Sequence, residues 1–228
     1  MTLGSVRARA PFVLARSLLH RLSVVRSAAI IIPAPSQEPG LQEEATHPVT
    51  TPQVIQTPDP THHEDATVMA LIEIPRGSRN KYEFDEATGR FYLDRVLYSS
   101  VHYPTDYGYI VETLAGDGDP LDVLVLVQEP TFPGCMIEAR VLGGLDMYDE
   151  KGSDFKVLAV PVGDPRYAHY LRLADIGDHW LREIETFFAT YKLLEPKQTE
   201  VLGWHDLEET LATVTECRMR YQEKLAKP

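Results

Sequence analysis

Three aspartates fall within six residues of this chain, in the run Asp117-Gly-Asp119-Pro-Leu-Asp122. Carboxylates this close repel one another unless a cation lies between them, and Mg²⁺ takes such oxygen ligands while keeping positions open for substrate phosphates. The apolar run 123–127 follows directly and is typical of a buried strand. The sequence therefore predicts a metal-binding loop anchored on a strand, although an acidic loop by itself is more often solvated surface.

Charged residues two apart in a strand share one face. Lys81 with Glu83, and Asp154 with Lys156, have this spacing. Surface pairs of this kind contribute little to stability, but beside an aspartate cluster the acids could hold cations while the lysines bind phosphate. Arg95 lies among apolar neighbours, so we expect it to be buried and to need an anionic partner.

Two tyrosine-rich pieces could add neutral hydrogen-bond donors. Tyr103-Pro-Thr-Asp-Tyr107-Gly-Tyr109 is predicted to be a turn that presents phenols, and Tyr191-Lys192 to end a helix. A phenol can donate to phosphate without adding charge. Taken in isolation, each piece is better explained by aromatic core packing.

The elements that must position these residues are short strands followed by two helices. Strands are expected at residues 71–74, 82–84, 91–96, 121–127, 136–142 and 156–160. Helical spacing joins Ile184, Phe187, Phe188 and Tyr191, and also Leu207, Leu211 and Val214. Asp206 and Glu209 offer a capping box for the second helix. This order predicts a mainly β fold of the α+β class, a small barrel with helices packed outside.

Composition excludes several classes of function. The 228-residue chain has a net charge of −12, which argues against binding nucleic acid or an anionic membrane through bulk electrostatics. No apolar stretch is long enough to span a bilayer. The two cysteines, Cys135 and Cys217, have no paired spacing, so neither a disulfide framework nor a zinc site is expected, and a reducing compartment is favoured.

The chain divides near residue 66. Residues 1–36 contain five arginines and no acidic residue, and residues 33–66 are rich in Pro, Thr, Gln and His. We expect residues 1–66 to be a disordered extension and residues 67–228 to form one domain. The extension has the composition of an organellar transit peptide. It could equally be an incidental leader, because Met69 stands just before the first expected strand.

Together these pieces resemble a soluble family I inorganic pyrophosphatase of the bacterial and plant type, over residues 69–225. The pieces that carry the resemblance occur in the family's order: Glu73-Ile-Pro75, Lys81-Tyr-Glu83, Asp94-Arg95, Tyr103 to Tyr109, Asp117 to Asp122, Asp149 to Asp154 with Lys156, and Tyr191-Lys192. The resemblance implies a closed five-stranded barrel of the oligonucleotide-binding type with two C-terminal helices. It also implies hydrolysis of pyrophosphate to two phosphates, with several Mg²⁺ ions and direct attack by a water that bridges metals.

The resemblance assigns a role to each site residue by position. Asp119 matches the acid that orients or deprotonates the attacking water. Metal ligands are matched by Asp117, Asp122, Asp154 and Asp149, with Glu83 and Glu73 as outer carboxylates that act through water. Phosphate-binding positions are matched by Lys81, Arg95, Tyr107, Lys156, Tyr191 and Lys192.

Other kinds of protein fit the sequence less well. A haloacid-dehalogenase-like phosphatase would place its Asp-x-Asp motif after a buried strand, whereas the apolar run here follows Asp117 and Asp119. An EF-hand would need glycine where Asp122 stands and glutamate where Gln128 stands. A catalytically silent member that binds phosphate or metal is the remaining alternative, and no expected polar position is replaced.

Assembly and location are expected from the family alone. Bacterial relatives are commonly hexamers, so a homo-oligomer is predicted, with the helix of Phe187 and Phe188 as an interface. Thr186 and Thr190 stand where some relatives have histidines, which puts a histidine-mediated contact in doubt. We expect a cytoplasmic enzyme, or a mitochondrial or plastid one if residues 1–66 are a transit peptide.

Overall fold

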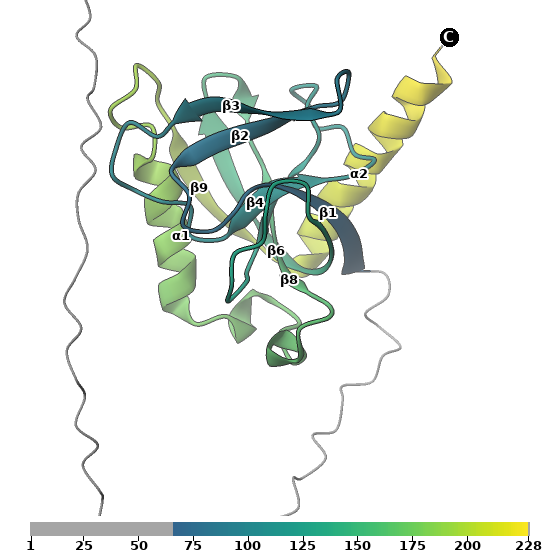
Figure 1. Cartoon of the computed structure of the whole chain (residues 1–228). Coiled ribbons are helices and arrows are strands. Elements are labelled where there is room, and N and C mark those ends of the chain that lie inside the picture. The colour runs from purple at the N-terminus through teal and green to yellow at the C-terminus, as the bar shows by residue number, and fades with distance from the viewer. Residues whose placement is uncertain (1–65, 228) are drawn as a thin grey trace, which may run out of the picture. The chain divides into compact units, whose positions relative to one another are not determined.

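The computed structural model describes residues 66–227 of the chain, and Figure 1 labels its main elements. The strands are β1 (Thr67–Ile74), β2 (Asn80–Asp85), β3 (Arg90–Val96), β4 (Asp106–Ile110), β5 (Asp122–Val125), β6 (Met136–Asp149), β7 (Gly152–Ser153), β8 (Lys156–Pro161) and β9 (Glu200–His205). The α-helices are α1 (Asp178–Thr190) and α2 (Leu207–Ala226), and short 3₁₀ turns cover Pro165–Tyr167 and Leu173–Asp175. The expected division near residue 66 and the two interpretations of the extension concern residues outside this range.

Five strands close into a barrel. They pair in the order β1-β4-β5-β8-β6, and β6 pairs back to β1. Every pairing in this circuit is antiparallel except β5 with β8, which is parallel. Closure leaves no exposed sheet edge in the barrel. The predicted fold class, a five-stranded closed barrel with two C-terminal helices, is confirmed.

The barrel strands are covered on both faces. Successive residues of a strand point to opposite sides, so Leu124 of β5 packs in a cluster with Phe188 of α1. Val123 and Val125 pack in a second cluster that includes Val214 of α2. Burial on both faces explains why residues 123–127 are continuously apolar rather than alternating.

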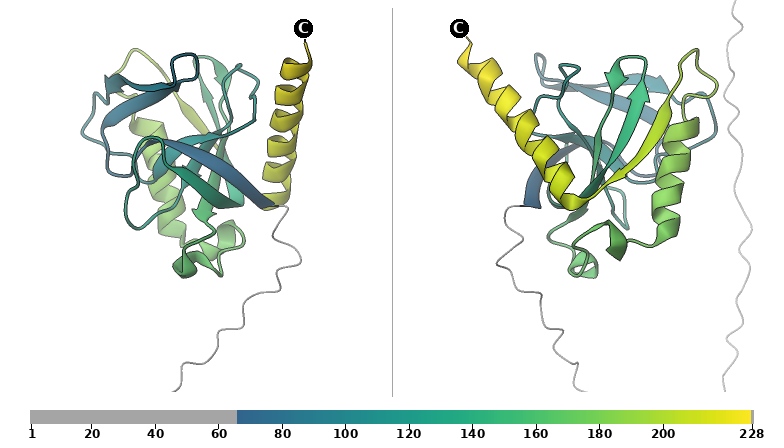
Figure 2. Two further views of the ribbon diagram at one scale, coloured as in Figure 1. Left: turned by 45° about the vertical axis from the view of Figure 1, so that its right-hand side comes forward. Right: turned by 180° about the vertical axis from the view of Figure 1, so that it is seen from behind.

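The helices flank the barrel on different sides, α1 beside β9 and α2 along β6 (Figure 1 and Figure 2). Both were predicted from their spacing. Asp206 caps α2 as expected, because its Oδ1 accepts a hydrogen bond 3.0 Å from the backbone N–H of Glu209. Within residues 66–227, neither helix combines the length and apolar character needed to cross a membrane.

Three strands were not predicted from the sequence. Tyr107 and Tyr109 lie in strand β4, not in a turn, and neither β7 nor β9 was expected. Gly108 explains the first difference: a Cβ there would lie 1.9 Å from the Leu71 carbonyl oxygen, so only glycine lets β4 approach β1 so closely. Glycine is normally a strand breaker, and in this case it permits the strand.

Strand β6 also runs further than the expected 136–142. The pair Gly143-Gly144 reads as a break, yet β6 continues through it to Asp149. A Cβ on Gly144 would lie 2.2 Å from the ring of Phe155, so the missing side chain makes room for packing. The extension matters for the site because it carries the chain to Asp149.

Strands β2 and β3 form a separate two-stranded sheet, called here the ribbon. Figure 1 shows the ribbon lying across one end of the barrel. The ribbon is joined to the barrel at Glu73 of β1, whose Oε1 accepts a hydrogen bond of 2.7 Å from the Phe84 backbone N–H. It brings Lys81 and Arg95 to that end of the fold.

Candidate active site

The site is built around the buried ammonium group of Lys156. Asp122 begins β5 and Lys156 begins β8, and these parallel neighbours are paired with the two residues side by side. Lys156 Nζ donates to Asp122 Oδ2 at 2.6 Å and to Asp154 Oδ1 at 2.8 Å, and its side chain is only 2% exposed. Two carboxylates therefore converge on one cation position at the end of the barrel.

The electrostatics of this position follow from its burial. Desolvation disfavours the charged ammonium, but attraction to Asp122 and Asp154 outweighs it and raises the pKa of Lys156. Burial raises the pKa of Asp154, with repulsion from Asp122 and Asp149 acting against attraction to Lys156. Burial is therefore the main cause of the pKa shift of Asp154, whereas attraction to the two carboxylates causes that of Lys156.

Tyr107 brings a phenol to the same point. Its hydroxyl donates to Asp122, and Lys156 Nζ lies 5.5 Å from the centre of its ring. Burial is the main cause that raises the pKa of Tyr107 well above its usual value, so the group remains a neutral donor. Tyr103, by contrast, packs its ring 4.8 Å from that of Phe187 and belongs to the core.

The other predicted aspartates gather around a second lysine, Lys151, which was not predicted. Lys151 Nζ lies 2.9 Å from Asp119 Oδ2, and both side chains are 63% exposed. The hydrogen bond to Asp119 is the main cause that raises the pKa of Lys151, and the charges of Asp117 and Asp149 add to it. Lys151 lies in the turn between β6 and β7, where no periodicity in the sequence indicated a site.

Asp117 and Asp119 lie in the loop between β4 and β5, which are antiparallel. The backbone N–H of Asp119 donates to Asp117 Oδ1 at 3.2 Å, so the loop is partly ordered by its own carboxylate. A haloacid-dehalogenase-like site would need a parallel β-α unit at this point. The topology therefore removes that alternative.

The chain segment after α1 contributes Tyr191 and Lys192. Lys192 Nζ is 3.0 Å from Asp149 Oδ2 and 3.1 Å from Glu150 Oε2. Lys197 Nζ also bonds Glu150, at 2.8 Å. Burial opposes ionisation of Glu150, but the hydrogen bonds from Lys197 and Lys192 prevail and lower its pKa to about 2.

Tyr191 serves the core as well as the site. Its ring stacks on Phe187 at 5.3 Å between centroids, and Lys192 Nζ lies 5.5 Å from the same ring. Burial raises the pKa of Tyr191. The core-packing interpretation is therefore correct for Tyr191. Its position beside Lys192 is also compatible with a hydrogen bond from its hydroxyl to phosphate.

The ribbon supplies the remaining cations. Lys81 and Arg95 are direct cross-strand partners, and Lys81 donates to Glu83 as their shared face predicts. Arg95 Nη1 donates to Asp94 Oδ2 at 2.6 Å. Arg95 Nε donates to Glu195 Oε1 at 3.2 Å. Arg95 thus has the anionic partners that its expected burial required.

Glu73 lies deeper than its predicted role as an outer carboxylate implied. Burial is the main cause that raises its pKa to about 7, and the backbone N–H of Phe84 partly opposes the shift. Repulsion from the Asp122 carboxylate also raises the pKa of Glu73, so the two acidic groups interact electrostatically. Its carboxylate, however, accepts its hydrogen bond from the ribbon, at the backbone N–H of Phe84.

The oxygen donors of the site are of a kind that can hold a divalent metal ion. Within the part of the chain that the structure describes, no three carboxylate, imidazole or thiolate side chains are already grouped closely enough to hold an ion. Ammonium groups stand between the carboxylates instead, as with Lys156 between Asp122 and Asp154. Oxygen donors that converge on a cation position are the kind that Mg²⁺ prefers. The residues fit a hard divalent ion.

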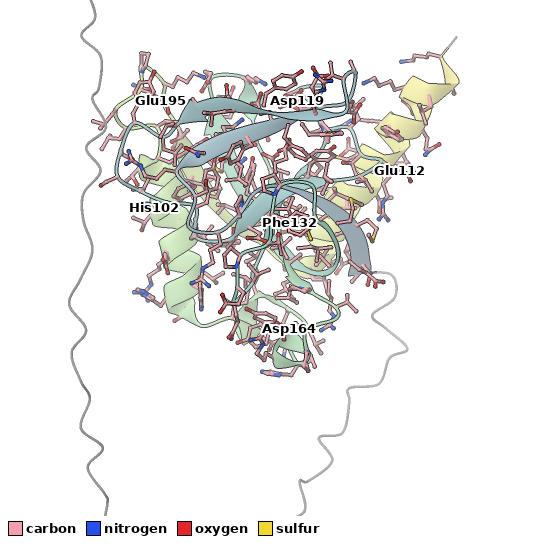
Figure 3. The ribbon with its side chains drawn as sticks, viewed as in Figure 1. His102, Glu112, Asp119, Phe132, Asp164 and Glu195 are labelled. Atoms are coloured by element: carbon pink, nitrogen blue, oxygen red, sulfur yellow. The ribbon has the colours of Figure 1, made fainter. Side chains whose placement is uncertain are left out.

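In Figure 3, Asp119 and Glu195 are labelled toward the end of the barrel that the ribbon covers, and Asp164 lies toward the opposite end. All the predicted site residues come from the ribbon, from β1 and β4, from the 117–122 and 149–156 segments, or from the segment after α1. The structure distributes them over clusters around Lys156, Lys151 and Lys192 and over the ribbon, to which Glu73 of β1 is joined.

Comparisons with known proteins agree on one family. The family model described as inorganic pyrophosphatase matches residues 70–222. Among its relatives, the inorganic pyrophosphatase of Halalkalibacterium halodurans is 54% identical over 159 residues, which cover 70% of this chain and 98% of the relative. The inorganic pyrophosphatase of a Synechocystis strain is 52% identical over 163 residues, covering 72% of this chain and 96% of the relative.

A solved structure gives the same result for the fold. The crystal structure of inorganic pyrophosphatase from Thermus thermophilus is 46% identical, with a TM-score of 0.68, and the match covers 73% of this chain and 95% of that one. Nearly the full length of each relative is therefore represented within this chain. On the strength of the family model, the relatives and the barrel, this chain belongs to the family I inorganic pyrophosphatases, the enzymes that hydrolyse inorganic pyrophosphate.

Proposed function

We propose that the chain hydrolyses pyrophosphate to two phosphates by direct attack of water, in a reaction that depends on Mg²⁺. The observation that carries this proposal is the convergence of Asp122 and Asp154 on the buried Lys156 ammonium, at 2.6 and 2.8 Å. A position that already stabilises one positive charge between two carboxylates is suited to divalent ions and to the phosphates they accompany. When bound, Mg²⁺ would lower the pKa of the attacking water and neutralise the charge of pyrophosphate.

Asp117, Asp122, Asp154 and Asp149 are proposed as the metal ligands, with Glu73 and Glu83 acting through water. Asp119 is proposed to accept a proton from the attacking water. Its 63% exposure leaves the carboxylate accessible once Lys151 moves aside. The water oxygen bonds to phosphorus, and the bridging oxygen leaves with the electrons of the broken P–O bond. No covalent bond to the protein is needed.

The cationic residues are proposed to bind the phosphate oxygens. Lys81 and Arg95 approach from the ribbon, Lys156 from β8 and Lys192 from the segment after α1. Tyr107 and Tyr191 add neutral hydroxyl groups. Preorganised cations stabilise the charge that develops on the leaving phosphate, which is the main requirement of phosphoryl transfer.

The test is a phosphate-release assay on pyrophosphate with the purified chain. We expect turnover with Mg²⁺ and none in EDTA. Excess Ca²⁺ should inhibit because a larger ion with looser coordination would misplace the water, and fluoride should inhibit by replacing hydroxide. Full activity in the chelator would contradict the metal-dependent mechanism, and no activity with Mg²⁺ would favour a silent binding member.

Assembly as a homo-oligomer, with a hexamer favoured, remains a proposal. Phe187 and Phe188 are buried within the chain, so they do not themselves form an interface. The outer face of α1 and β9 instead borders a groove of about 410 Å³, lined by Glu185, Thr186, Ala189, Val201, Leu202 and Gly203. Thr190 Oγ1 donates to the Thr186 carbonyl oxygen at 2.6 Å, within α1 itself. We therefore do not expect these two positions to form the contact that histidines would make between subunits. Sedimentation velocity would give the number of chains.

The compartment is likewise proposed rather than established. We infer a cytoplasmic enzyme, with a mitochondrion or plastid as the alternative if residues 1–66 direct import. Fusing residues 1–66 to a fluorescent reporter distinguishes the two, because organellar signal supports a transit peptide and diffuse signal an incidental leader.

A further inference from the structure

Glu195 is a buried carboxylate in an otherwise exposed segment. Its side chain is 5% exposed, whereas the adjacent Leu193 and Leu194 are 72% and 64% exposed. A charged carboxylate is not withdrawn from water without a partner. The partner is Arg95, whose Nε lies 3.2 Å from Glu195 Oε1 although the two residues are 100 positions apart. This long-range contact joins the segment after α1 to the ribbon.

The ribbon needs such an anchor. It has only two strands, and an isolated pair of strands is at best marginally stable in water. Lys81 and Arg95 stand directly opposite each other in its ladder, where like charges destabilise the pairing. The residues proposed to bind phosphate are therefore on the part of the fold least able to hold them in place.

A chain of alternating charges offsets this repulsion. Lys81 Nζ lies 3.6 Å from Asp94 Oδ2, and Arg95 Nη1 donates to the same oxygen at 2.6 Å. Glu195 extends the chain on the far side of Arg95. Asp94 belongs to the ribbon and moves with it, whereas Glu195 belongs to the segment that follows α1 and can fix the guanidinium relative to the barrel.

The geometry of the guanidinium shows how both functions can coexist. Glu195 accepts a hydrogen bond from Arg95 Nε, and Asp94 accepts one from Arg95 Nη1. Within residues 66–227, no group hydrogen-bonds the remaining Nη2 of Arg95. A guanidinium is a planar fork with donors in fixed directions, so fixing two of its nitrogens sets the direction of the third.

We propose that Glu195 is a positioning residue for pyrophosphate binding, acting through Arg95. It would hold the guanidinium so that the free Nη2 meets a phosphate oxygen, without touching the substrate itself. This inference rests on the proposed function, because it takes Arg95 as a phosphate-binding residue. Nothing else in the proposed catalytic apparatus requires Glu195.

The experiment compares Glu195→Gln with Glu200→Gln, which removes the same charge from an exposed position on β9. We expect Glu195→Gln to raise KM for pyrophosphate by about three- to tenfold, the size of coupling found between residues in direct contact. Its kcat should change less than about twofold, because the water and its acceptor are untouched. Glu200→Gln should match the wild type in both constants.

A double-mutant cycle separates positioning from a general structural effect. In an Arg95→Ala background, Glu195→Gln should change kcat/KM by less than about twofold, since its partner is gone. Three results would each overturn the inference. Glu195→Gln could lower kcat/KM as much in the Arg95→Ala background as in the wild type. Glu195→Gln alone could have the same KM as Glu200→Gln, or a lower kcat at constant KM. Should circular dichroism show that Glu195→Gln is unfolded, Glu195→Asp, which keeps the charge on a shorter side chain, is compared instead with Glu200→Asp.

The two proposals fail in different ways. Inactivity of the wild-type chain with Mg²⁺ would remove the proposed function. An active wild type with a Glu195→Gln variant of unchanged KM would remove only the role of Glu195.

Discussion

At the scale of single residues, the carboxylates of the site form ion pairs with a few lysines. Asp122 and Asp154 share Lys156, while Asp119 is paired with Lys151. The first arrangement is buried and the second exposed. Desolvation makes the buried ion pairs costly to break, whereas solvent screens the exposed one. The same substitution therefore has different consequences in the two places.

Substitutions of the aspartates should separate their roles. Asp119→Asn should spare Mg²⁺ affinity and stability but lower kcat about 10²- to 10⁴-fold, because an amide cannot accept the proton. Asp122→Ala should weaken Mg²⁺ binding and lower kcat together, and should destabilise the fold by about 3 kcal/mol because it removes a partner from buried Lys156. Metal titration by calorimetry, steady-state kinetics and urea unfolding measure the three effects. A phosphoryl group trapped on Asp117 would contradict direct attack by water.

Glu73 should make stability depend on pH. Its folded-state pKa of about 7 lies above the ordinary glutamate pKa of 4.5, so the folded chain binds more protons than the unfolded chain between these values. The free energy of unfolding should therefore fall as pH rises through this window, by up to about 3 kcal/mol. Glu73→Gln, which keeps an acceptor for the Phe84 N–H, should lose this component. Urea unfolding of the wild type and of Glu73→Gln, in metal-free buffer at pH 4 and pH 8, measures this difference. The same change in the free energy of unfolding between the two pH values in both proteins would refute the prediction.

At the scale of elements, the site depends on how closely neighbouring strands approach. Strand β4 places Tyr107 beside Asp122 of β5, and this requires β4 to lie against β1 at Gly108. The parallel pairing of β5 and β8 places Asp122 next to Lys156. These two contacts are therefore consequences of strand register.

Gly108→Ala tests this dependence. The added Cβ would meet the Leu71 carbonyl oxygen at 1.9 Å, so we expect a loss of about 3 kcal/mol or more in the free energy of unfolding. Activity should fall with it, because Tyr107 would be displaced from Asp122. Gly116→Ala is the matched control, since its Cβ would meet no atom within 4 Å. Thermal unfolding of both variants gives the answer, and equal midpoints would show that β4 adjusts freely.

At the scale of the whole molecule, the first barrel strand begins before Met69, the residue that the sequence placed just ahead of it. Met69 lies inside β1, and Val68, which precedes it, is 2% exposed. Thr67 and Val68 also pair with Arg140 and Ala139 of β6. The interpretation of Met69 as standing just before the first strand is therefore wrong, because β1 already contributes to barrel closure there.

Two truncated chains should differ for this reason. A chain that begins at Ala66, behind an added Met, should fold, assemble and hydrolyse pyrophosphate like the full chain. A chain that begins at Met69 loses buried Val68 and part of the β1–β6 ladder, and should be less stable by about 2 kcal/mol. Thermal midpoints, sedimentation and phosphate release compare them. Loss of most activity in the longer truncated chain would mean that residues 1–65 contribute to the fold.

Much of this protein was determined by sequence alone, because local patterns report local requirements. The aspartate run, the Lys-x-Glu and Asp-x-Lys spacings and the helical periodicities each depend on neighbours a few residues away. They predicted the family, the barrel with two helices and the type of chemistry. They also predicted the contact of Lys81 with Glu83, whose spacing along β2 places both on one face, and the contact of Lys156 with Asp154, which lies two residues before it.

The tertiary structure decided what depends on distant contacts. Strand β4 was hidden because Gly108 resembles a breaker until β1 lies against it. The continuation of β6 through Gly143-Gly144 was hidden because Phe155 fills the space. Lys151 reaches Asp119 across 32 positions and Glu195 reaches Arg95 across 100. No pattern in the chain carries such pairings, since burial and charge compensation arise only when the strands have closed into a barrel.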